Sequence, residues 1–239
     1  MRPLVLLGDS HVRYFQRAAK AGFLGARPVV VSEVVGATAV GMRNPKSKTD
    51  ALGRFREALA RTTGPQTVVL HLGEVDCGFV IWYRAAKYGE DVHDQARASI
   101  ASYFAFVDEL LAEGRFHVVV TGATLPTLRD GDGGGEGGGE VANLRKEVTA
   151  TLAERTALTL WYNMLLRTNA AQRALPFVDM ASQAIDPATG VVKDWFRHPN
   201  PRDHHMHTLR AARLWGRLLR PVLARLDQAA DAPARPMVA

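Results

Sequence analysis

A serine between an aspartate and a histidine lies close to the start of the chain. Asp9, Ser10 and His11 directly follow the apolar run LVLLG. A serine hydroxyl becomes a nucleophile when a base removes its proton, and an imidazole is the usual base. Aspartate and histidine are also metal ligands, and serine is a common helix N-cap. The residue types therefore leave three interpretations open: a nucleophile, a metal-binding pair, or a strand that ends in a turn.

A second cluster of reactive side chains lies near the end of the chain. Of the 8 histidines, three fall in the segment DHHMH at 203–207. The aspartate of this segment is close enough in sequence to orient one of the rings, as an acid orients the base of a serine nucleophile. We therefore expect the segment to be functional, with His204, His205 and His207 all candidates for the base.

The pattern of apolar runs predicts the elements that must position these clusters. Short apolar runs, typical of buried parallel strands, lie at 3–7, 28–34, 67–72, 117–122 and 175–180. Helical patterns separate or follow them at 11–21, 49–61, 91–113, 141–166 and 209–226. Strands that alternate with helices predict an α/β fold. Because crossovers are right-handed, we expect a three-layer α/β/α sandwich around a five-stranded parallel sheet.

Unusual residues follow most of the predicted strands. Ligands of open parallel sheets bind outside the carboxyl ends of the strands. Ser10 follows the first strand, a glycine-containing segment begins at Gly36 after the second, and GEVDC follows the third. The DHHMH segment comes after the fifth strand and before the last helix. This arrangement predicts one site at that edge of the sheet.

Composition and length limit the class of protein. The 239 residues carry a formal net charge of +6, and the positive residues are scattered. We therefore expect no nucleic-acid partner. The apolar runs are too short to cross a bilayer, the start is too short for a signal peptide, and the single cysteine excludes an internal disulfide. These features predict a cytoplasmic protein without a membrane partner; they leave the oligomeric state open.

The chain is predicted to form one domain over residues 1–226. The glycine-rich acidic segment 129–140 is expected to be a flexible loop, and residues 227–239 a disordered tail.

Four motifs, in order, resemble those of the SGNH (GDSL-like) hydrolase superfamily. They are GDSH at 8–11, GATAVGMRNPKSKT at 36–49, GEVDC at 73–77 and the late Asp/His cluster at 203–207. The middle two also look like a bacterial branch of that superfamily that is often encoded beside glycan-synthesis genes. The resemblance covers nearly the whole chain. It implies a flavodoxin-like sandwich and a serine hydrolase that needs no metal or cofactor.

The resemblance also assigns roles. Ser10 matches the nucleophile, and its N–H matches one oxyanion donor. Gly36 matches a second donor, with Gly41 a weaker match. His205 best matches the general base, and Asp203 the acid that orients it.

Two features depart from the superfamily pattern. Its third block is usually Gly-x-Asn-Asp, whereas this chain has Val75 at the asparagine position, so one oxyanion donor is missing. Glu74 and Asp76 replace that donor only if protonated; otherwise they are candidates for binding a polar substrate group. The superfamily acid lies three residues before the histidine, whereas Asp203 lies two before His205.

These observations favour a serine-dependent esterase that acts on an acylated glycan or small metabolite through an acyl-enzyme. We expect the acyl group to be acetyl. Trp82 and Arg84, which follow the third block, are candidate contacts for a sugar face and an anionic group. Three alternatives stay open. They are an O-acyltransferase of the same fold, a catalytically degenerate binding domain, and a metal-dependent phosphoesterase built on Asp9, His11 and a His-x-His pair at 205 and 207.

Overall fold

A single parallel sheet organises the molecule. The computed structural model describes residues 1–44, 46–132 and 148–231. The sheet has the strand order β2-β1-β3-β4-β5, which is that of flavodoxin-like folds. Its strands are β1 (Leu4–Gly8), β2 (Val29–Glu33), β3 (Gln66–His71), β4 (Phe116–Thr121) and β5 (Phe177–Val178). The predicted α/β sandwich with a five-stranded parallel sheet is therefore confirmed.

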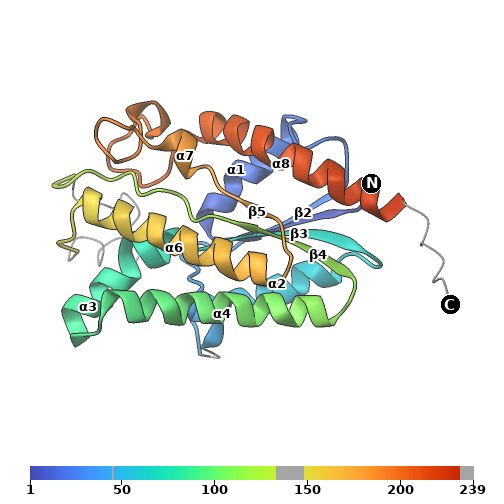
Figure 1. The fold of residues 1–239 in the computed structure, drawn as a ribbon, viewed down its shortest axis with the longest axis horizontal. Coiled ribbons are helices and arrows are strands. Elements are labelled where there is room, and N and C mark those ends of the chain that lie inside the picture. The colour runs from blue at the N-terminus through green and yellow to red at the C-terminus, as the bar shows by residue number, and fades with distance from the viewer. Residues whose placement is uncertain (45, 133–147, 232–239) are drawn as a thin grey trace.

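Helices cover both faces of the sheet (Figure 1). Alternate residues of a strand point to opposite faces. Leu4 and Leu6 of β1 accordingly pack in one core cluster, and Val5 and Leu7 in the other. The first cluster is closed by α1 (Arg13–Lys20), α7 (Ala181–Ala184) and α8 (Thr208–Asp231). The second is closed by α2 (Ala51–Ala60), α3 (Ile81–Tyr88), α4 (Val92–Ala112) and α6 (Leu152–Gln172).

Helix α6 begins later than its apolar pattern predicts. The pattern suggested a helix over 141–166, whereas the helix runs from Leu152 to Gln172. Thr151 caps its start: its side chain accepts the Glu154 N–H, and Glu154 in turn accepts the Thr151 N–H. Such a capping box satisfies backbone donors at a helix start, and it fixes the boundary here.

Two other predicted segments differ in extent. Helix α8 continues to Asp231, so residues 227–231 are helical and do not belong to a disordered tail. Of the predicted flexible loop 129–140, the first residues are anchored: Arg129 pairs with Asp194, and Asp130 accepts the Leu152 N–H at 2.6 Å. Residues 133–140 of that segment and 232–239 of the tail lie outside the described residues.

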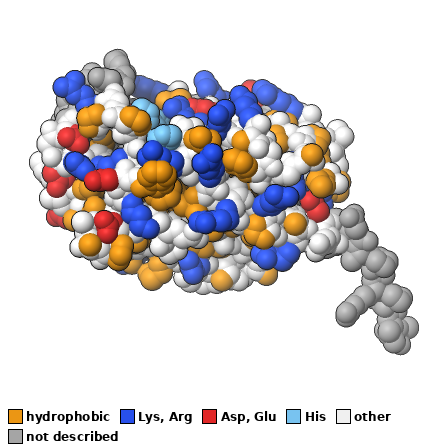
Figure 2. Space-filling view, turned by 90° about the horizontal axis from the view of Figure 1, so that it is seen from above, with side chains coloured by type: hydrophobic (Ala, Val, Ile, Leu, Met, Phe, Trp, Pro, Cys, Tyr) orange, Lys and Arg blue, Asp and Glu red, His pale blue; other side chains and the backbone are white. Residues whose placement is uncertain are grey.

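Charged side chains are spread over the surface. Figure 2 shows Lys and Arg side chains interspersed with apolar and acidic ones over the visible face. Several are ion-paired, including Arg13 with Glu33 and Arg173 with Asp108. Within the described residues, no helix combines the length and the apolar character that a membrane span requires.

Gly8 ends the first strand where the chain has no room for a side chain. A Cβ at this position would lie 2.3 Å from the backbone oxygen of His71 on β3. Gly8 thus permits the close approach of β1 and β3 directly before the Asp9–Ser10–His11 segment.

We therefore expect Gly8→Ala to lower the free energy of unfolding by about 2–3 kcal/mol, because the backbone must shift to relieve the overlap. The measurement is urea denaturation of both proteins. Gly64→Ala is the control, since an added Cβ there meets no atom within 4 Å; the strain of its positive φ costs about 1 kcal/mol. Equal losses in the two variants would contradict the packing argument.

Candidate active site

The carboxyl ends of the strands bring four segments together. Ser10 begins a short 3-10 helix (Ser10–Val12) after β1. The Gly36 turn follows β2, and the Val34 N–H beside it donates to the Gly8 carbonyl at 2.9 Å. The GEVDC segment follows β3 and leads into a π-helical turn (Asp76–Val80). The histidine segment 203–207 lies directly before α8.

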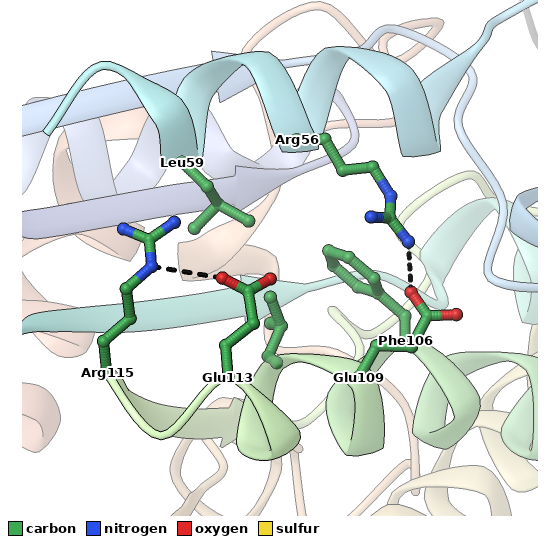
Figure 3. Close-up of a pocket in the computed structure, with 7 residues that line it drawn as sticks. Arg56, Leu59, Phe106, Glu109, Glu113 and Arg115 are labelled. Carbon is green, nitrogen blue, oxygen red and sulfur yellow. Dashed lines mark hydrogen bonds and ion pairs between the residues drawn. The ribbon is translucent and has the colours of Figure 1, made fainter. Parts of the chain in front are cut away.

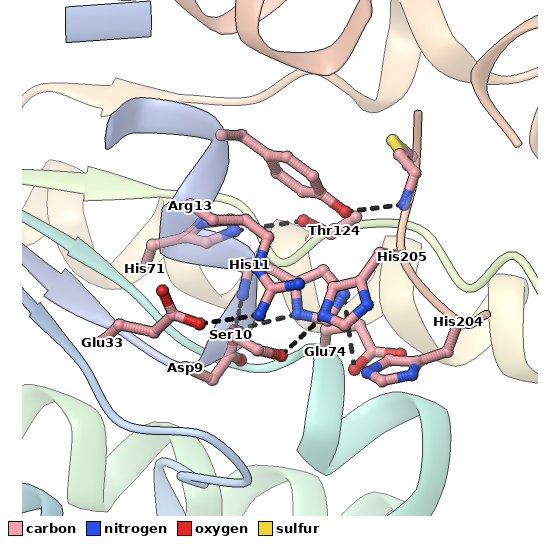
Figure 4. A network of polar contacts seen from close by, with 12 residues as sticks. Asp9, Ser10, His11, Arg13, Glu33, His71, Glu74, Thr124, His204 and His205 are labelled. Carbon is pink, nitrogen blue, oxygen red and sulfur yellow. Dashed lines mark hydrogen bonds and ion pairs between the residues drawn. The ribbon is translucent and has the colours of Figure 1, made fainter. Parts of the chain in front are cut away.

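Ser10, His205 and Asp203 form a continuous chain of hydrogen bonds. Ser10 Oγ lies 2.8 Å from His205 Nε2, and His205 Nδ1 lies 2.7 Å from Asp203 Oδ1. Figure 4 shows the Ser10 hydroxyl directed at the His205 ring. The Asp203 carboxylate fixes the tautomer in which Nδ1 carries the proton, so Nε2 is free to accept the proton of Ser10.

A local turn explains why an acid two residues before the histidine can orient it. Asp203 Oδ1 accepts both the backbone N–H of His205, at 2.9 Å, and its ring Nδ1–H, at 2.7 Å. Aspartate readily bonds the backbone two residues ahead, and the ring here uses the same oxygen. The departure from the usual spacing therefore leaves the geometry of the pair intact.

The same turn occurs at the start of the chain. Asp9 Oδ1 accepts the backbone N–H of His11 at 2.8 Å and lies 2.9 Å from His11 Nδ1. His11 is fully buried, and its Nε2 faces Glu74 Oε2 at 3.8 Å. Sequence reasoning did not place His11 in the serine site. The repeated Asp-x-His pattern at 9–11 and 203–205 is the signal that would have found it.

Contacts from distant elements hold the histidine segment in place. The hydroxyl of Tyr14 on α1 accepts the Met206 N–H at 2.6 Å. Thr127, in the loop after β4, donates its hydroxyl to the His204 carbonyl at 2.7 Å. Arg197 donates to the Thr127 carbonyl. The base is thus anchored on both sides by buried or partly buried hydrogen bonds.

The alternative bases have other positions. The His204 ring lies against the His205 ring at a tilt of 39°, with 4.0 Å between the two centroids. The backbone N–H of His207 bonds the Phe196 carbonyl at 2.8 Å. Of the three clustered histidines, His205 is the one whose hydrogen bond to Ser10 is seen in the described part of the chain.

Burial and charge set the protonation of the base. Burial lowers the pKa of His205 below 6.5, and the hydrogen bond to Asp203 opposes that shift. The nearby charge of Arg13 lowers the pKa of His205 further. The hydrogen bond from His205 lowers the pKa of Asp203 well below its usual range. His205 is therefore neutral, and Asp203 ionised, near neutral pH.

Asp76 is buried beneath the loop that follows Gly36 and holds that loop. Its buried carboxylate accepts the N–H groups of Ala39 and Val40 at 2.9 and 3.2 Å. It also accepts the Ser99 hydroxyl at 2.7 Å, and Ser99 in turn bonds the Tyr162 hydroxyl at 2.8 Å. The carboxylate is thus fully buried and accepts from three donors within the protein, and its contact with substrate stays a prediction.

The rest of the third block is also buried. Gly73 has a φ of +120°, and a Cβ there would lie 2.8 Å from the Tyr162 ring. Val75 is buried in the core, and its hydrocarbon side chain supplies no polar donor. Glu74 is the member of the block whose carboxylate reaches the cluster of histidines, where it faces His11.

Trp82 and Arg84 also have partners within the protein. The Trp82 indole N–H donates to the Cys77 carbonyl at 2.8 Å, and its ring packs against the core. Arg84 bonds Glu90 at 2.7 Å and Gln95 at 3.0 Å. These contacts stabilise the corner between α3 and α4, and the sugar contact of Trp82 and Arg84 stays a prediction.

The two glycines of the second segment differ. Gly36 lies in a turn with a φ of +75°, a conformation that favours glycine. The Gly41 N–H donates to the Thr38 hydroxyl at 2.9 Å. Because its N–H is already bonded, Gly41 is the poorer candidate for an oxyanion donor.

Of the surface hollows, one lies beside this arrangement and another lies away from it. One lies between α2 and the end of α4, where Arg56 pairs with Glu109 and Arg115 with Glu113 (Figure 3). Another, of about 320 Å³, borders Asp203 and is lined by Thr127, Arg129, Arg197 and His198. The second hollow lies beside the acid of the hydrogen-bonded chain, whereas the first contains no predicted site residue.

Solved structures of esterases have a similar architecture. A carbohydrate acetylesterase family member from Sinorhizobium meliloti superposes with a TM-score of 0.63 at 15% identity, covering 95% of this chain and 99% of its own. A GDSL-like lipase from Bacteroides thetaiotaomicron gives 0.61 at 15% identity, covering 94% and 89%. The M. smegmatis aryl esterase gives 0.58 at 15% identity, covering 95% and 99%. The chain shares the fold of these proteins. No family model and no curated protein matches the sequence.

The pKa shift of His205 predicts its titration. We expect the His205 ring to stay neutral at pH 6.5 and to gain its proton below that value, since burial lowers its pKa. Histidine-labelled protein followed by NMR gives the midpoint, with the signal assigned by its loss in His205→Gln. Arg13→Gln should raise the midpoint, because a repelling charge is removed, whereas Arg17→Gln on the exposed side of α1 should leave it unchanged. A midpoint above pH 7 would contradict the assignment.

The Asp76 network predicts a specific loss of stability. Asp76→Asn is expected to lower the free energy of unfolding by about 2–3 kcal/mol, since the amide nitrogen that replaces one carboxylate oxygen cannot accept the hydrogen bond made to that oxygen and leaves a buried donor facing it. Hydrogen exchange at Ala39 and Val40 should accelerate at the same time. Ser99→Ala removes one of the three donors and should cost about 1 kcal/mol. Unchanged exchange at both amides in Asp76→Asn would show that another contact holds the loop.

Proposed function

We propose that the protein is a serine ester hydrolase of the SGNH (GDSL-like) type. The observation that carries the proposal is the hydrogen-bonded chain from Ser10 through His205 to Asp203. The motifs of the sequence and the esterase fold of the structural neighbours support it.

The proposed reaction uses Ser10 as nucleophile. His205 Nε2 takes the hydroxyl proton while Ser10 Oγ attacks the ester carbonyl carbon. Asp203 stabilises the imidazolium that forms. Collapse of the tetrahedral intermediate transfers that proton to the departing alcohol and leaves an acyl-enzyme. Water then attacks the acyl carbon, with His205 again accepting the proton, and the acid and free Ser10 are released.

Two backbone donors are proposed to stabilise the oxyanion. The N–H of Ser10 stands at the start of a helical turn, where such groups have no acceptor within the helix. The Gly36 turn lies beside the end of β1 and is braced by Asp76. A third donor is missing at Val75, and one such donor is typically worth about 3 kcal/mol of transition-state stabilisation. We therefore expect slower turnover of simple esters than three donors would give.

An acylated carbohydrate is the proposed class of substrate. The structural neighbours include a carbohydrate acetylesterase family member. An acyl-enzyme of this kind also reacts with a sugar hydroxyl in place of water, which would make the protein an O-acyltransferase. The phosphoesterase alternative is not proposed, because His207 bonds the Phe196 carbonyl through its backbone and its ring does not join those of His11 and His205 in the described cluster.

A fluorophosphonate probe combined with an ester screen tests the proposal. Wild type should be labelled covalently at Ser10 and should hydrolyse short-chain acyl esters or acetylated sugars. Ser10→Ala should lose labelling and at least about 10³-fold in kcat/KM, as removal of a serine nucleophile does elsewhere. Ser182→Ala, at an exposed serine on α7, is the matched control and should behave as wild type.

The outcomes separate the alternatives. Labelling at Ser10 together with acyl transfer to added sugars, faster than hydrolysis, identifies a transferase. Absence of labelling between pH 6 and 9 in folded protein would refute the enzyme and favour a binding domain.

A further inference from the structure

Three histidine rings meet at the proposed active site. Potential ligand nitrogens of His11, His204 and His205 all lie within 4.8 Å of one another. The centroid of the His11 ring is 5.5 Å from that of His204 and 4.7 Å from that of His205. Figure 4 shows the three rings together beside Glu74. The proposed hydrolytic chemistry uses one of these rings and leaves the other two without a role.

Two of the rings are oriented as metal ligands are. Histidines that bind metals almost always donate their second ring N–H to a carboxylate, a carbonyl or water. His11 Nδ1 lies 2.9 Å from Asp9 Oδ1, and His205 Nδ1 lies 2.7 Å from Asp203 Oδ1. Both Asp-x-His turns therefore direct Nε2, the atom that would coordinate, into the cluster.

The charge around the cluster favours a cation. Carboxylates of Asp9 and Glu74 are buried there, and Asp203 adds a third. Glu74 Oε2 is 3.8 Å from His11 Nε2, so this carboxylate oxygen is a candidate for the fourth ligand. Asp9 Oδ2 is buried without a hydrogen-bond partner within the described residues. Arg13, the nearby cation, is paired with Glu33 at 2.8 Å.

We propose that His11, His204 and His205 bind one divalent transition-metal ion, such as Zn²⁺, and that the ion inhibits the enzyme. Imidazole nitrogens suit Zn²⁺, Cu²⁺ and Ni²⁺. Nitrogens bound to a tetrahedral Zn²⁺ lie about 3.3 Å apart, from metal–nitrogen lengths of about 2.0–2.1 Å. Because the ligand nitrogens lie within 4.8 Å of one another, shifts of up to about 1.5 Å close the site, and the half-buried His204 ring is the freest to move. Coordination occupies His205 Nε2, the atom that accepts the Ser10 proton.

The inhibition rests on the proposed function, whereas the binding of the ion does not. A bound metal keeps a lone pair of His205 from Ser10, so the hydroxyl cannot be deprotonated. Removal of the ion with a chelator restores the hydrogen bond. This behaviour is opposite to that of a metal-dependent hydrolase, in which a chelator abolishes activity.

Zinc binding to the full-length chain provides the first test. Competition with a chromophoric chelator should show one equivalent of Zn²⁺ bound to wild type. His204→Gln and His11→Gln should each weaken binding at least tenfold. His93→Gln, at an exposed histidine of α4 outside the cluster, is the matched control and should bind as wild type. Because His11 is buried, circular dichroism checks its variant, and His204→Gln decides the test if His11→Gln fails to fold.

The rate of Ser10 labelling by the fluorophosphonate probe provides the second test. One equivalent of Zn²⁺ should slow labelling of wild type at least tenfold, and a chelator should reverse the effect. His204→Gln should label at the same rate with and without Zn²⁺. Equal zinc affinity of wild type, His204→Gln and His93→Gln would overturn the metal site. Absence of labelling without zinc would instead refute the proposed function and leave the binding result standing.

Discussion

The hydrogen bond between Ser10 and His205 joins residues that are 195 positions apart in the chain. It exists because β1 and the segment before α8 both reach the carboxyl edge of one parallel sheet. In such a sheet every strand leaves at the same edge, so side chains that follow different strands converge there. The packing of α1 against α8 and the hydrogen bond from the Met206 N–H to the Tyr14 hydroxyl hold the segment after β1 close to the segment before α8. Without that convergence, Ser10 and His205 would not meet.

A single local device, the Asp-x-His turn, shapes both halves of the site. In each copy one carboxylate oxygen binds a backbone N–H and a ring N–H of the histidine two residues on. The backbone bond fixes the turn, and the ring bond fixes the tautomer. In the second copy the result is an imidazole nitrogen aimed at Ser10. In the first it is a buried histidine aimed at Glu74, and the two together form the cluster from which metal binding is inferred.

The GEVDC block holds the loop that follows β2 through the carboxylate of Asp76. Asp76 receives two backbone N–H groups from the loop after β2 and a hydroxyl from α4. Burial raises the pKa of this carboxyl, while these three donors oppose the rise. A carboxylate thus braces the loop that presents Gly36, and the side chain at the asparagine position, Val75, belongs to the core. The block therefore holds the loop without the amide side chain that the sequence comparison led us to expect at Val75.

The sequence determined the sheet, the layers and the segments that carry the site. Apolar runs and helical periodicity are local properties of a chain, and they located all five strands to within a few residues. The capping box at Thr151 was equally local, although the apolar pattern alone did not indicate it. The motifs also indicated Ser10, Asp203 and His205, with His204 and His207 left as alternative bases.

Only the tertiary structure decided which ring meets Ser10, because that contact depends on how the loop after β4 and the α1 helix hold the segment 203–207. It likewise decided that Asp76 and Arg84 face the protein interior or neighbouring side chains, since their partners lie on other elements. Residue type and spacing reveal which groups a chain offers. The partners of a charged side chain are set by contacts between distant elements, and those contacts form only when the sheet and its helices pack together.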